Sequence, residues 1–420
     1  MLEKFDYNTA KNLDKKDPLL KYRDLFFFPK HKQKKCLYFC GNSLGLQPKK
    51  TEKYIKDELN DWATYGVDGH FEAKNPWFDY HKILTKQTAT LVGAKDHEVV
   101  VMNGLTTNIH LLLMSFYRPK KNRYKILCES NAFPSDLYVL ESQVELHGYK
   151  FEDAVVKIPC DNNGVVDQDN LLKLINEIGD QLALIFIGGV NYYSGQVFNI
   201  PEITKIGHKV GALVGFDLAH AAGNIILDLH DWNVDFAAWC SYKYLNSGPG
   251  NVSGVFIHQN QSNQNPFRLK GWWGHSEKTR FSYNKKKKFK PMKGAEGWQL
   301  SNAPVFGMAA HKASLDIFSE VGMISLVSKS KNLVSALESI FVNFNRNSKN
   351  IKFKIITPQQ RGCQLSVLVN KSGKEVYKIL NKNGVVVDWR EPNVIRFAPV
   401  PLYNSFEDIF NFGQILKKCL

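Results

Sequence analysis

Between residues 98 and 258, short apolar runs alternate with stretches of helical periodicity. The runs with the length and apolar content of buried strands are 98–102, 125–129, 154–158, 182–187, 212–217, 235–240 and 254–258. The helical stretches between them lie near 105–117, 134–147, 168–179 and 201–210. Such alternation is typical of an α/β fold, in which helices cover a mainly parallel sheet. Because the crossovers of such a sheet are right-handed, we expect ligands at the carboxyl ends of the strands.

The chain before this alternation is predicted to be largely helical. Residues 1–47 should form an N-terminal arm with a short helix near 8–15. Pro48 then occupies a position where a helix would start, since proline suits the first turn. Helical patterns follow at about 49–65 and 77–93.

The pattern changes again after about residue 305. Apolar residues at helical spacing predict a long amphipathic helix, and they are Leu333, Val334, Leu337, Ile340 and Phe341. The shorter elements predicted after it are strands at 351–356, 363–369, 385–388 and 393–397, a helix at 373–382 and a last helix at the end. We therefore expect a large domain from 48 to 304 and a smaller α+β domain from 305 to 420, to which the arm contributes.

Composition narrows the class of protein. The chain has 420 residues, of which 44% are hydrophobic, so it can bury a sizeable core. It has no run of 18 or more apolar residues and no apolar segment near its start, so we expect neither a membrane span nor a secretion signal. Its seven cysteines have no framework spacing, which favours reduced thiols and a cytoplasmic location.

The formal net charge of +15 could attract anionic partners. The densest basic run, Lys285 to Lys288, lacks interleaved aromatic residues and accompanies no nucleic-acid-binding motif, so we interpret it as a solvated loop. Cys36 and Cys40 have no second ligand pair nearby, so no metal site is predicted. The positive field could still help to attract anionic ligands, a property compatible with many functions.

Three polar clusters follow predicted strands. In the first, Gly104 permits a tight turn and Thr106 can bind an anion at a helix N-terminus, although an ordinary helix cap has the same pattern. In the second, Asp217 ends an apolar strand, where it could cap a helix or face a protonated ring nitrogen. In the third, Lys243 follows the strand at 235–240 and either extends to solvent or presents a desolvated amine for a Schiff base.

Together the clusters describe one site with a phosphate cup, an anionic partner for a pyridinium ring, and an amine. Pyridoxal phosphate needs these three supports, and it then serves as an electron sink. Other phosphate-binding motifs are absent, because there is no Walker A sequence and the stretch from Gly41 to Gly45 is not G-x-G-x-x-G. The combination therefore predicts a pyridoxal-phosphate enzyme.

Longer motifs carry a family resemblance. They lie at 41–48 (GNSLGLQP), 132–136 (AFPSD), 215–221 (GFDLAHA), 239–246 (WCSYKYLN), 271–275 (GWWGH), 300–304 (LSNAP) and 395–404 (IRFAPVPLYN). Over almost its whole length the chain resembles the kynureninases, a family of class V aminotransferases. The resemblance implies the aspartate-aminotransferase-like (type I) fold, with a mainly parallel seven-stranded sheet in the large domain. The core from Asp217 to Lys243 is shared with cysteine desulfurases, whereas the tryptophan and final arginine motifs are more particular to kynureninases.

The resemblance also implies roles for individual residues. Lys243 would bind the cofactor and take a proton from the substrate, Asp217 would pair with the pyridine nitrogen, and Tyr242 would assist proton transfers. The other residues of the implied cofactor shell are Leu105, Thr106, Phe133, Pro134, Ser135, Asp136, His220, Trp272 and Asn302. The implied substrate-binding residues are Ser43, His70, Asn302 and Arg396. Within these sets, Phe133 would stack on the ring, and Trp272 and Asn302 would come from the second subunit of a homodimer.

The implied reaction is hydrolysis of L-kynurenine or 3-hydroxy-L-kynurenine to L-alanine and an anthranilate, in tryptophan catabolism and the kynurenine route to pyridine nucleotides. Arg396 would bind the substrate α-carboxylate, a task that suits a bidentate guanidinium. His70 and Asn302 would hydrogen-bond a phenolic hydroxyl, so 3-hydroxykynurenine is expected to be preferred. The chain departs from the family at Gly188, where many members carry a serine near the phosphate, which puts that contact in doubt.

Two alternatives stay open on the sequence. A cysteine desulfurase or selenocysteine lyase needs a nucleophilic cysteine on a mobile loop, whereas Cys363 lies in an apolar strand pattern typical of a structural thiol. A nucleic-acid-binding protein that reuses this fold is disfavoured, because Lys243 and Asp217 are both present and no DNA-binding motif is appended.

Overall fold

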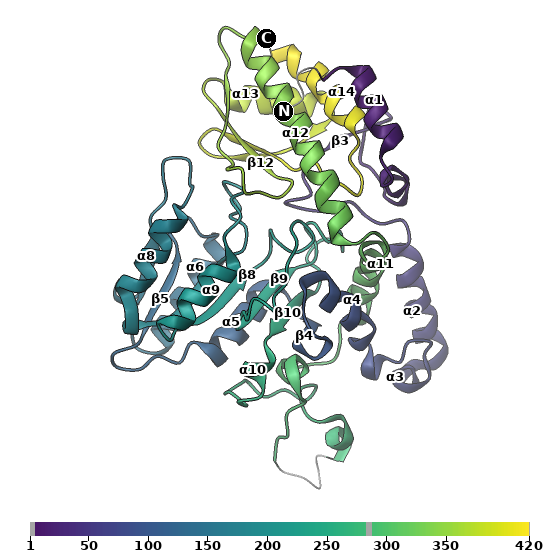
Figure 1. Cartoon of the computed structure of the whole chain (residues 1–420). Coiled ribbons are helices and arrows are strands. Elements are labelled where there is room, and N and C mark those ends of the chain that lie inside the picture. The colour runs from purple at the N-terminus through teal and green to yellow at the C-terminus, as the bar shows by residue number, and fades with distance from the viewer. Residues whose placement is uncertain (1–4, 283–287, 420) are drawn as a thin grey trace.

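The computed structural model describes residues 5–282 and 288–419 and centres on a seven-stranded sheet (Figure 1). Its strands are β4 (Val99–Met102), β5 (Lys125–Glu129), β6 (Val155–Ile158), β7 (Leu182–Gly188), β8 (Leu213–Asp217), β9 (Phe236–Cys240) and β10 (Ser253–Ile257). Their order in space is β4-β10-β9-β8-β7-β5-β6. Only β10 runs antiparallel to its neighbours among these strands, so the predicted mainly parallel sheet is confirmed.

Both faces of the sheet are buried, which explains why the strands are apolar almost throughout. The helices between them are α5 (Leu105–Phe116), α6 (Pro134–Leu146), α7 (Phe151–Ala154), α8 (Gln168–Ile178) and α9 (Ile200–Lys209). Alternate strand residues enter two separate apolar clusters, one with α5 and α6 and the other with α8 and α9. The strand pleat therefore divides the core into two layers, and the polar ends of the strands are left at the two edges.

A second, smaller sheet lies in the C-terminal region. Its strands are β11 (Phe353–Ile355), β12 (Leu365–Val369), β14 (Asp388–Arg390) and β15 (Val394–Phe397), and it is antiparallel in the order β11-β12-β15-β14. The helices of this region are α12 (Met323–Asn347), α13 (Gly373–Lys382) and α14 (Phe406–Leu416), and α1 (Tyr7–Lys16) of the arm packs against α14. The predicted strand at 385–388 is instead two: β13 (Val385–Val386) pairs with β3 (Leu37–Tyr38), and β14 joins the sheet.

Three helices pack together beside the large sheet, namely α2 (Thr51–Tyr65), α4 (Lys82–Val92) and α11 (Val305–Val321). The helix expected at 77–93 starts later, because Trp77–Asp79 form a separate 3₁₀ turn. Glu58 holds this turn by accepting hydrogen bonds from the Trp77 indole at 3.0 Å and the Tyr80 hydroxyl at 2.8 Å. The long α12 then leads into the smaller region (Figure 1). The domain limits at 47 and 304 stay predictions.

The remaining short elements are 3₁₀ helices η1 (Leu20–Leu25), η2 (Gly66–Asp68), η4 (Asp96–Glu98), η5 (Gly179–Gln181), η6 (Glu277–Ser282), η7 (Gly294–Trp298) and η8 (Lys417–Cys419), strands β1 (Lys30–His31) and β2 (Lys34–Lys35), and helices α3 (Gly69–Glu72) and α10 (Gln259–Ser262). Among the described residues, no helix combines the length and apolarity that a membrane crossing requires. Most of the basic run predicted to be a solvated loop, Lys285 to Lys287, lies outside the described residues.

Candidate active site

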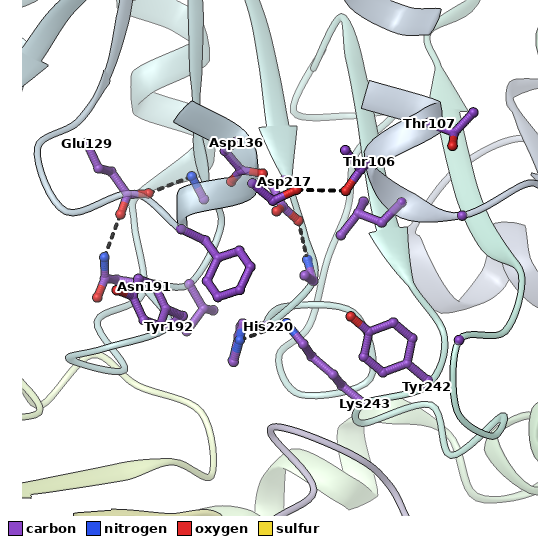
Figure 2. A pocket seen from close by; sticks show the side chains of 18 of the residues that line it. Thr106, Thr107, Glu129, Asp136, Asn191, Tyr192, Asp217, His220, Tyr242 and Lys243 are labelled. Carbon is purple, nitrogen blue, oxygen red and sulfur yellow. Dashed lines mark hydrogen bonds between the residues drawn. The ribbon is translucent and has the colours of Figure 1, made fainter. Parts of the chain in front are cut away.

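A cavity of about 280 Å³ opens at the carboxyl ends of the central strands, at the edge where ligands were expected (Figure 2). The sequence-predicted residues that line it are Leu105, Thr106, Phe133, Ser135, Asp136, Asp217, His220, Tyr242 and Lys243. They come from segments that follow β4, β5, β8 and β9. The three polar clusters of the sequence therefore meet in one pocket.

One wall of the pocket is built to accept an anion. Helix α5 begins there with Gly104 as N-cap, and α6 begins with Phe133 as N-cap; neither cap residue supplies a side-chain hydrogen bond. Thr106 Oγ1 and Ser135 Oγ, in the first turns of these helices, lie 2.8 Å apart. Because first-turn N–H groups lack intrahelical partners, two helix starts with hydroxyl groups form a phosphate-sized cup.

Asp217 lies at the end of β8, and its side chain is buried. Its Oδ1 accepts a hydrogen bond from the Ala219 N–H at 2.7 Å. Burial raises the pKa of Asp217, although Lys243 and this N–H oppose the rise. Burial and then the charge of Asp217 raise the pKa of the neighbouring Asp136 well above its usual value. The pair of carboxyls thus lacks a full complement of positive charge.

Lys243 Nζ lies 3.0 Å from His220 Nε2 and 5.8 Å from the centroid of the Phe133 ring. Burial, and then the charge of Lys243, lower the pKa of His220 well below its usual value, so this imidazole is neutral. Its Nδ1 is buried without a hydrogen-bond partner among the described residues. Burial raises the pKa of the Tyr242 phenol, which therefore keeps its proton. Amine, neutral imidazole and phenol are available for proton transfer.

Sequence reasoning missed several residues of the pocket. Glu129 ends β5 and is 2% exposed, while Asn191 and Tyr192 follow β7. The other missed lining residues are Val190, Gly250 and Asn251. A carboxylate at the end of an apolar strand was the available signal for Glu129, and it is the same signal that identified Asp217.

Arg396, on β15, does not line the pocket but lies directly behind Tyr192, whose carbonyl accepts a hydrogen bond from Nη1 at 2.6 Å. Its Nη2 donates to Asp388 at 2.5 Å and to Ser43 Oγ at 3.2 Å, and Ser43 itself donates to Asp388. The side chain of Arg396 is 1% exposed, and its Nε has no partner among the described residues. Ser43 and Arg396 are therefore brought together. Pro134 is the first residue of α6 and lies beside the lining residues rather than among them.

The other predicted substrate and interface residues lie outside the pocket of this single chain. His70 is half-buried, with its Nδ1 3.0 Å from the Val67 carbonyl and its ring 5.5 Å from that of Trp77. Trp272 is 47% exposed, and Asn302 is exposed. One chain alone does not unite these residues with Lys243.

Gly188, the departure from the family pattern, lines the pocket at the end of β7. Its N–H donates to Glu129 Oε1 at 2.6 Å. A Cβ at this position would lie 2.8 Å from the same oxygen, closer than real Cβ atoms approach. The glycine therefore allows the Glu129 carboxylate to lie against the backbone.

A second polar cluster lies at the other end of the parallel strands, directly before the start of β4. Glu98 lies 3.0 Å from His230 Nδ1 and 4.0 Å from His258 Nε2, and these residue types can hold a metal ion. The oxygens of Glu98 also accept hydrogen bonds from the backbone N–H groups of Lys95 at 3.0 Å and Gln259 at 2.8 Å. The cluster is a satisfied network of the chain itself.

Comparison with known proteins agrees with this geometry. The family model described as Aminotransferase class-V matches residues 38–389. The kynureninase of Flavobacterium psychrophilum is 53% identical over 414 residues, covering 97% of both chains. The human kynureninase is 42% identical over 435 residues, covering 99% of this chain and 93% of that one.

Solved structures with the same fold include the cysteine desulfurase CsdA of Escherichia coli, with a TM-score of 0.76 and 17% identity, covering 95% of this chain and 98% of that one. The apo cysteine desulfurase of Thermococcus onnurineus NA1 has a TM-score of 0.75 at 18% identity, covering 91% and 94%. At such identities the likeness concerns the fold alone. The sequence relatives and the family model show that the chain belongs to the kynureninase family, within the class V aminotransferases.

Proposed function

We propose that this protein hydrolyses the Cβ–Cγ bond of L-kynurenine or 3-hydroxy-L-kynurenine. Water and the kynurenine are consumed, and L-alanine and the matching anthranilate are released. The observation that carries the proposal is the meeting of Lys243, Asp217 and Tyr242 in one pocket of a chain that is 53% identical to a kynureninase. The direct test is incubation of the purified protein and pyridoxal phosphate with kynurenine, while the fluorescence of anthranilate is followed.

The residues of the pocket fit pyridoxal phosphate. The two uncapped helix starts suit its phosphate, the buried Asp217 suits a protonated ring nitrogen, and the Phe133 ring suits an aromatic face. The buried His220 Nδ1, which has no hydrogen-bond partner among the described residues, could bond a polar atom of the cofactor. When bound, the cofactor supplies an electron sink for the carbon atoms of the substrate.

In the proposed reaction Lys243 Nζ holds the cofactor and moves the α-proton of the substrate. The neutral His220 beside it offers an acceptor rather than a second positive charge. Asp217 keeps a proton on the ring nitrogen, since a buried carboxylate without full compensation favours an adjacent cation. Tyr242 keeps its phenolic proton and can donate it near the γ-carbonyl where water adds.

Arg396 binds the α-carboxylate in this proposal. Two guanidinium groups, those of Arg396 and Arg390, flank the single carboxylate of Asp388. Burial opposes the charge of Asp388, but the two arginines and Ser43 hold its pKa below the usual value. One positive charge therefore remains without an anionic partner in this group, which suits a substrate carboxylate.

A homodimer completes the site in this proposal, with Trp272 and Asn302 reaching the pocket of the partner subunit. The exposed Trp272 supports it, because its ring packs against that of the exposed Phe281, and contiguous exposed apolar surface is typical of an interaction site. Mixing inactive Lys243→Ala chains with inactive Asn302→Ala chains should restore activity, since one of the two sites in each mixed dimer is then intact. Full activity from a demonstrated monomer would contradict shared sites.

We further propose that 3-hydroxykynurenine is the preferred substrate, because His70 and Asn302 could both hydrogen-bond its phenolic hydroxyl. A site built for that bond loses about 1–3 kcal/mol when the hydroxyl is missing, which corresponds to roughly 5- to 150-fold in kcat/KM. Measuring both substrates with the wild type and with His70→Ala tests this. Equal efficiencies in the wild type, or an unchanged ratio in the variant, would exclude it. The proposed setting is the cytoplasm, in tryptophan catabolism and pyridine nucleotide synthesis.

A cysteine desulfurase activity is the main alternative, since such enzymes share the fold. The position of Cys363 argues against it, because this thiol is 1% exposed and burial raises its pKa to about 12. A thiol that stays protonated is a poor nucleophile. Release of sulfide from cysteine, without release of anthranilate from kynurenine, would reverse the assignment.

A further inference from the structure

Glu129 is a pocket residue without a role in the reaction described above. Its side chain is 2% exposed, and both carboxylate oxygens are occupied: Oε1 accepts the Gly188 N–H at 2.6 Å and Oε2 accepts Asn191 Nδ2 at 2.6 Å (Figure 2). A buried carboxylate costs free energy unless it is compensated. Burial raises the pKa of Glu129 to about 7, although these two donors oppose the rise. The chain thus retains, at the end of β5, a buried carboxyl group whose ionised form is costly.

The contact continues into a turn that follows β7. Asn191 Oδ1 accepts the N–H groups of Tyr193 at 3.0 Å and Ser194 at 2.9 Å, so one amide closes the turn while its other end is held by Glu129. Asn131 Oδ1 accepts a second hydrogen bond from Asn191 Nδ2 at 3.2 Å. The turn is therefore oriented by side chains at the end of β5 and just after it, not by its own backbone alone.

This turn carries the carbonyl of Tyr192, which accepts the hydrogen bond from Arg396 Nη1 at 2.6 Å. The Tyr192 ring also packs edge-on against the Phe133 ring, with centroids 5.3 Å apart. Gln364, directly before β12, donates to the same carbonyl at 3.1 Å. The backbone at Tyr192 is thus the link between the pocket wall and the buried arginine of the smaller region.

The close approach of Glu129 depends on Gly188. A Cβ there would meet Oε1 at 2.8 Å, so a side chain at this position would push the carboxylate from the backbone N–H. The residue that departs from the family pattern and the carboxylate that orients the turn are therefore one structural unit.

We propose that Glu129 is a positioning residue, which sets the place of Arg396, and so of the substrate α-carboxylate, through Asn191 and the Tyr192 carbonyl. The proposal deepens the proposed function and rests on it for the identity of the substrate. It assigns no chemistry to Glu129, because its carboxylate hydrogen-bonds to Gly188 and Asn191 and not to Lys243 or Arg396.

The test is Glu129→Gln in the holoenzyme. The glutamine has the size of the glutamate, but one of its two terminal atoms donates hydrogen bonds and would face the N–H donor of Gly188 or of Asn191. We expect KM for kynurenine to rise about tenfold while kcat changes less than about twofold, since the carboxylate subsite shifts and the proton-transfer groups do not. The visible absorbance of the bound cofactor should stay unchanged. Asn191→Ala removes the same hydrogen bond by deleting its donor, and it should likewise raise KM while kcat changes little.

A double variant with Arg396 distinguishes a positioning role of Glu129 from a general structural role. In an Arg396→Lys background, Glu129→Gln should have little further effect on KM, because the geometry that it maintains is already lost. An equal effect in both backgrounds would overturn the proposal. Glu98→Gln is the matched control, since Glu98 is also buried and its carboxylate also accepts hydrogen bonds from N–H donors, but at the far edge of the sheet.

A second readout needs no turnover. The apparent Kd for L-alanine, measured from the change in cofactor absorbance, should rise in Glu129→Gln and stay constant in Glu98→Gln. An unchanged Kd in Glu129→Gln would overturn the positioning role even if the wild type released no anthranilate. Conversely, failure of the wild type to cleave kynurenine, with Kd shifted as expected, would exclude the proposed function alone.

Discussion

Carboxylates are buried at both edges of the seven-stranded sheet, the far edge with the amino end of β4 and the pocket edge at the carboxyl ends of the parallel strands. Only at the far edge do neighbouring groups of the chain compensate the negative charge. At the amino end of β4, burial works against the charge of Glu98, yet two backbone N–H groups and His230 outweigh it and lower its pKa. At the carboxyl ends, burial raises the pKa values of Glu129, Asp136 and Asp217. The far edge is balanced by the chain itself, whereas the pocket edge is not.

This difference shows that the buried acidic groups at the pocket edge lack full compensation from the chain. A buried acidic group without full compensation destabilises the protein alone, so its retention indicates a partner that arrives later. A pyridinium nitrogen and a substrate amine are cations of the required kind. The balanced edge, by contrast, contributes stability and needs no ligand. Each prediction below changes the pocket edge, and all but the last use the far edge as the control.

The largest effect is expected from Lys243→Ala at the pocket edge. Loss of the amine should remove the visible absorbance of the bound cofactor and lower kcat by about 10³-fold or more, because general base catalysis alone contributes up to about 10⁴-fold. Lys95→Ala is the control, since Lys95 lies at the far edge beside Glu98. Steady-state kinetics and an absorbance scan measure both. Retention of the band and of most activity in Lys243→Ala would show that the amine is not the cofactor-binding group.

Asp217→Ala should leave the cofactor bound but lower kcat by roughly 10²-fold, or about 3 kcal/mol. Without the carboxylate the ring nitrogen loses its proton more easily, and the electron sink weakens. The matched variant at the far edge is Glu98→Ala, which should lower the temperature of unfolding and leave kcat nearly unchanged. Near-normal kinetics for Asp217→Ala would remove the distinction between the edges.

The two edges should respond to pH in opposite directions. The folded-state pKa of Glu129 is raised to about 7, so its contribution to stability is present below the unfolded value near 4.3 and is lost as pH rises through about 7. The pKa of Glu98 is lowered, so its contribution is present above about 4.3 and is lost as pH falls below that value.

Urea unfolding of the cofactor-free protein checks this. Between about pH 5 and pH 8, Glu129→Gln should gain up to about 3 kcal/mol relative to the wild type. Over the same range the destabilisation of Glu98→Gln should stay constant, and it should shrink only in stronger acid. Parallel curves for the two variants would mean that the edges do not differ electrostatically.

The smallest effect is expected from Gly188→Ala. The added methyl meets Glu129 Oε1 at 2.8 Å, and such overpacking costs about 1–3 kcal/mol. Gly104→Ala is the control at the same edge, because a Cβ there meets nothing within 4 Å and the backbone φ of −97° is ordinary. Chemical unfolding of both variants gives the comparison. Equal stability would indicate that the carboxylate relaxes freely and that Gly188 is not needed for its position.

Asp217 and Lys243 could be predicted because each directly follows a strand whose apolar run is visible in the sequence. Glu129 ends the predicted strand at 125–129 in the same way, but no motif separates a carboxylate that faces a pocket from one that ends a strand in solvent. The contact between Tyr192 and Arg396 spans 204 residues, and no local pattern reports it. Prediction therefore found the pocket residues that directly follow a visible apolar strand, and it missed the contacts between distant segments.

The sequence by itself determined the order of strands and helices, since periodicity and burial are properties of neighbouring residues. It also placed Lys243 and Asp217 at strand ends, and family motifs supplied the roles proposed for them. Only the tertiary structure decided which strands are neighbours, how the strand expected at 385–388 divides between two sheets, and how Glu129 reaches Gly188. Those outcomes depend on packing between segments far apart in the chain, where small differences in space and charge select one arrangement.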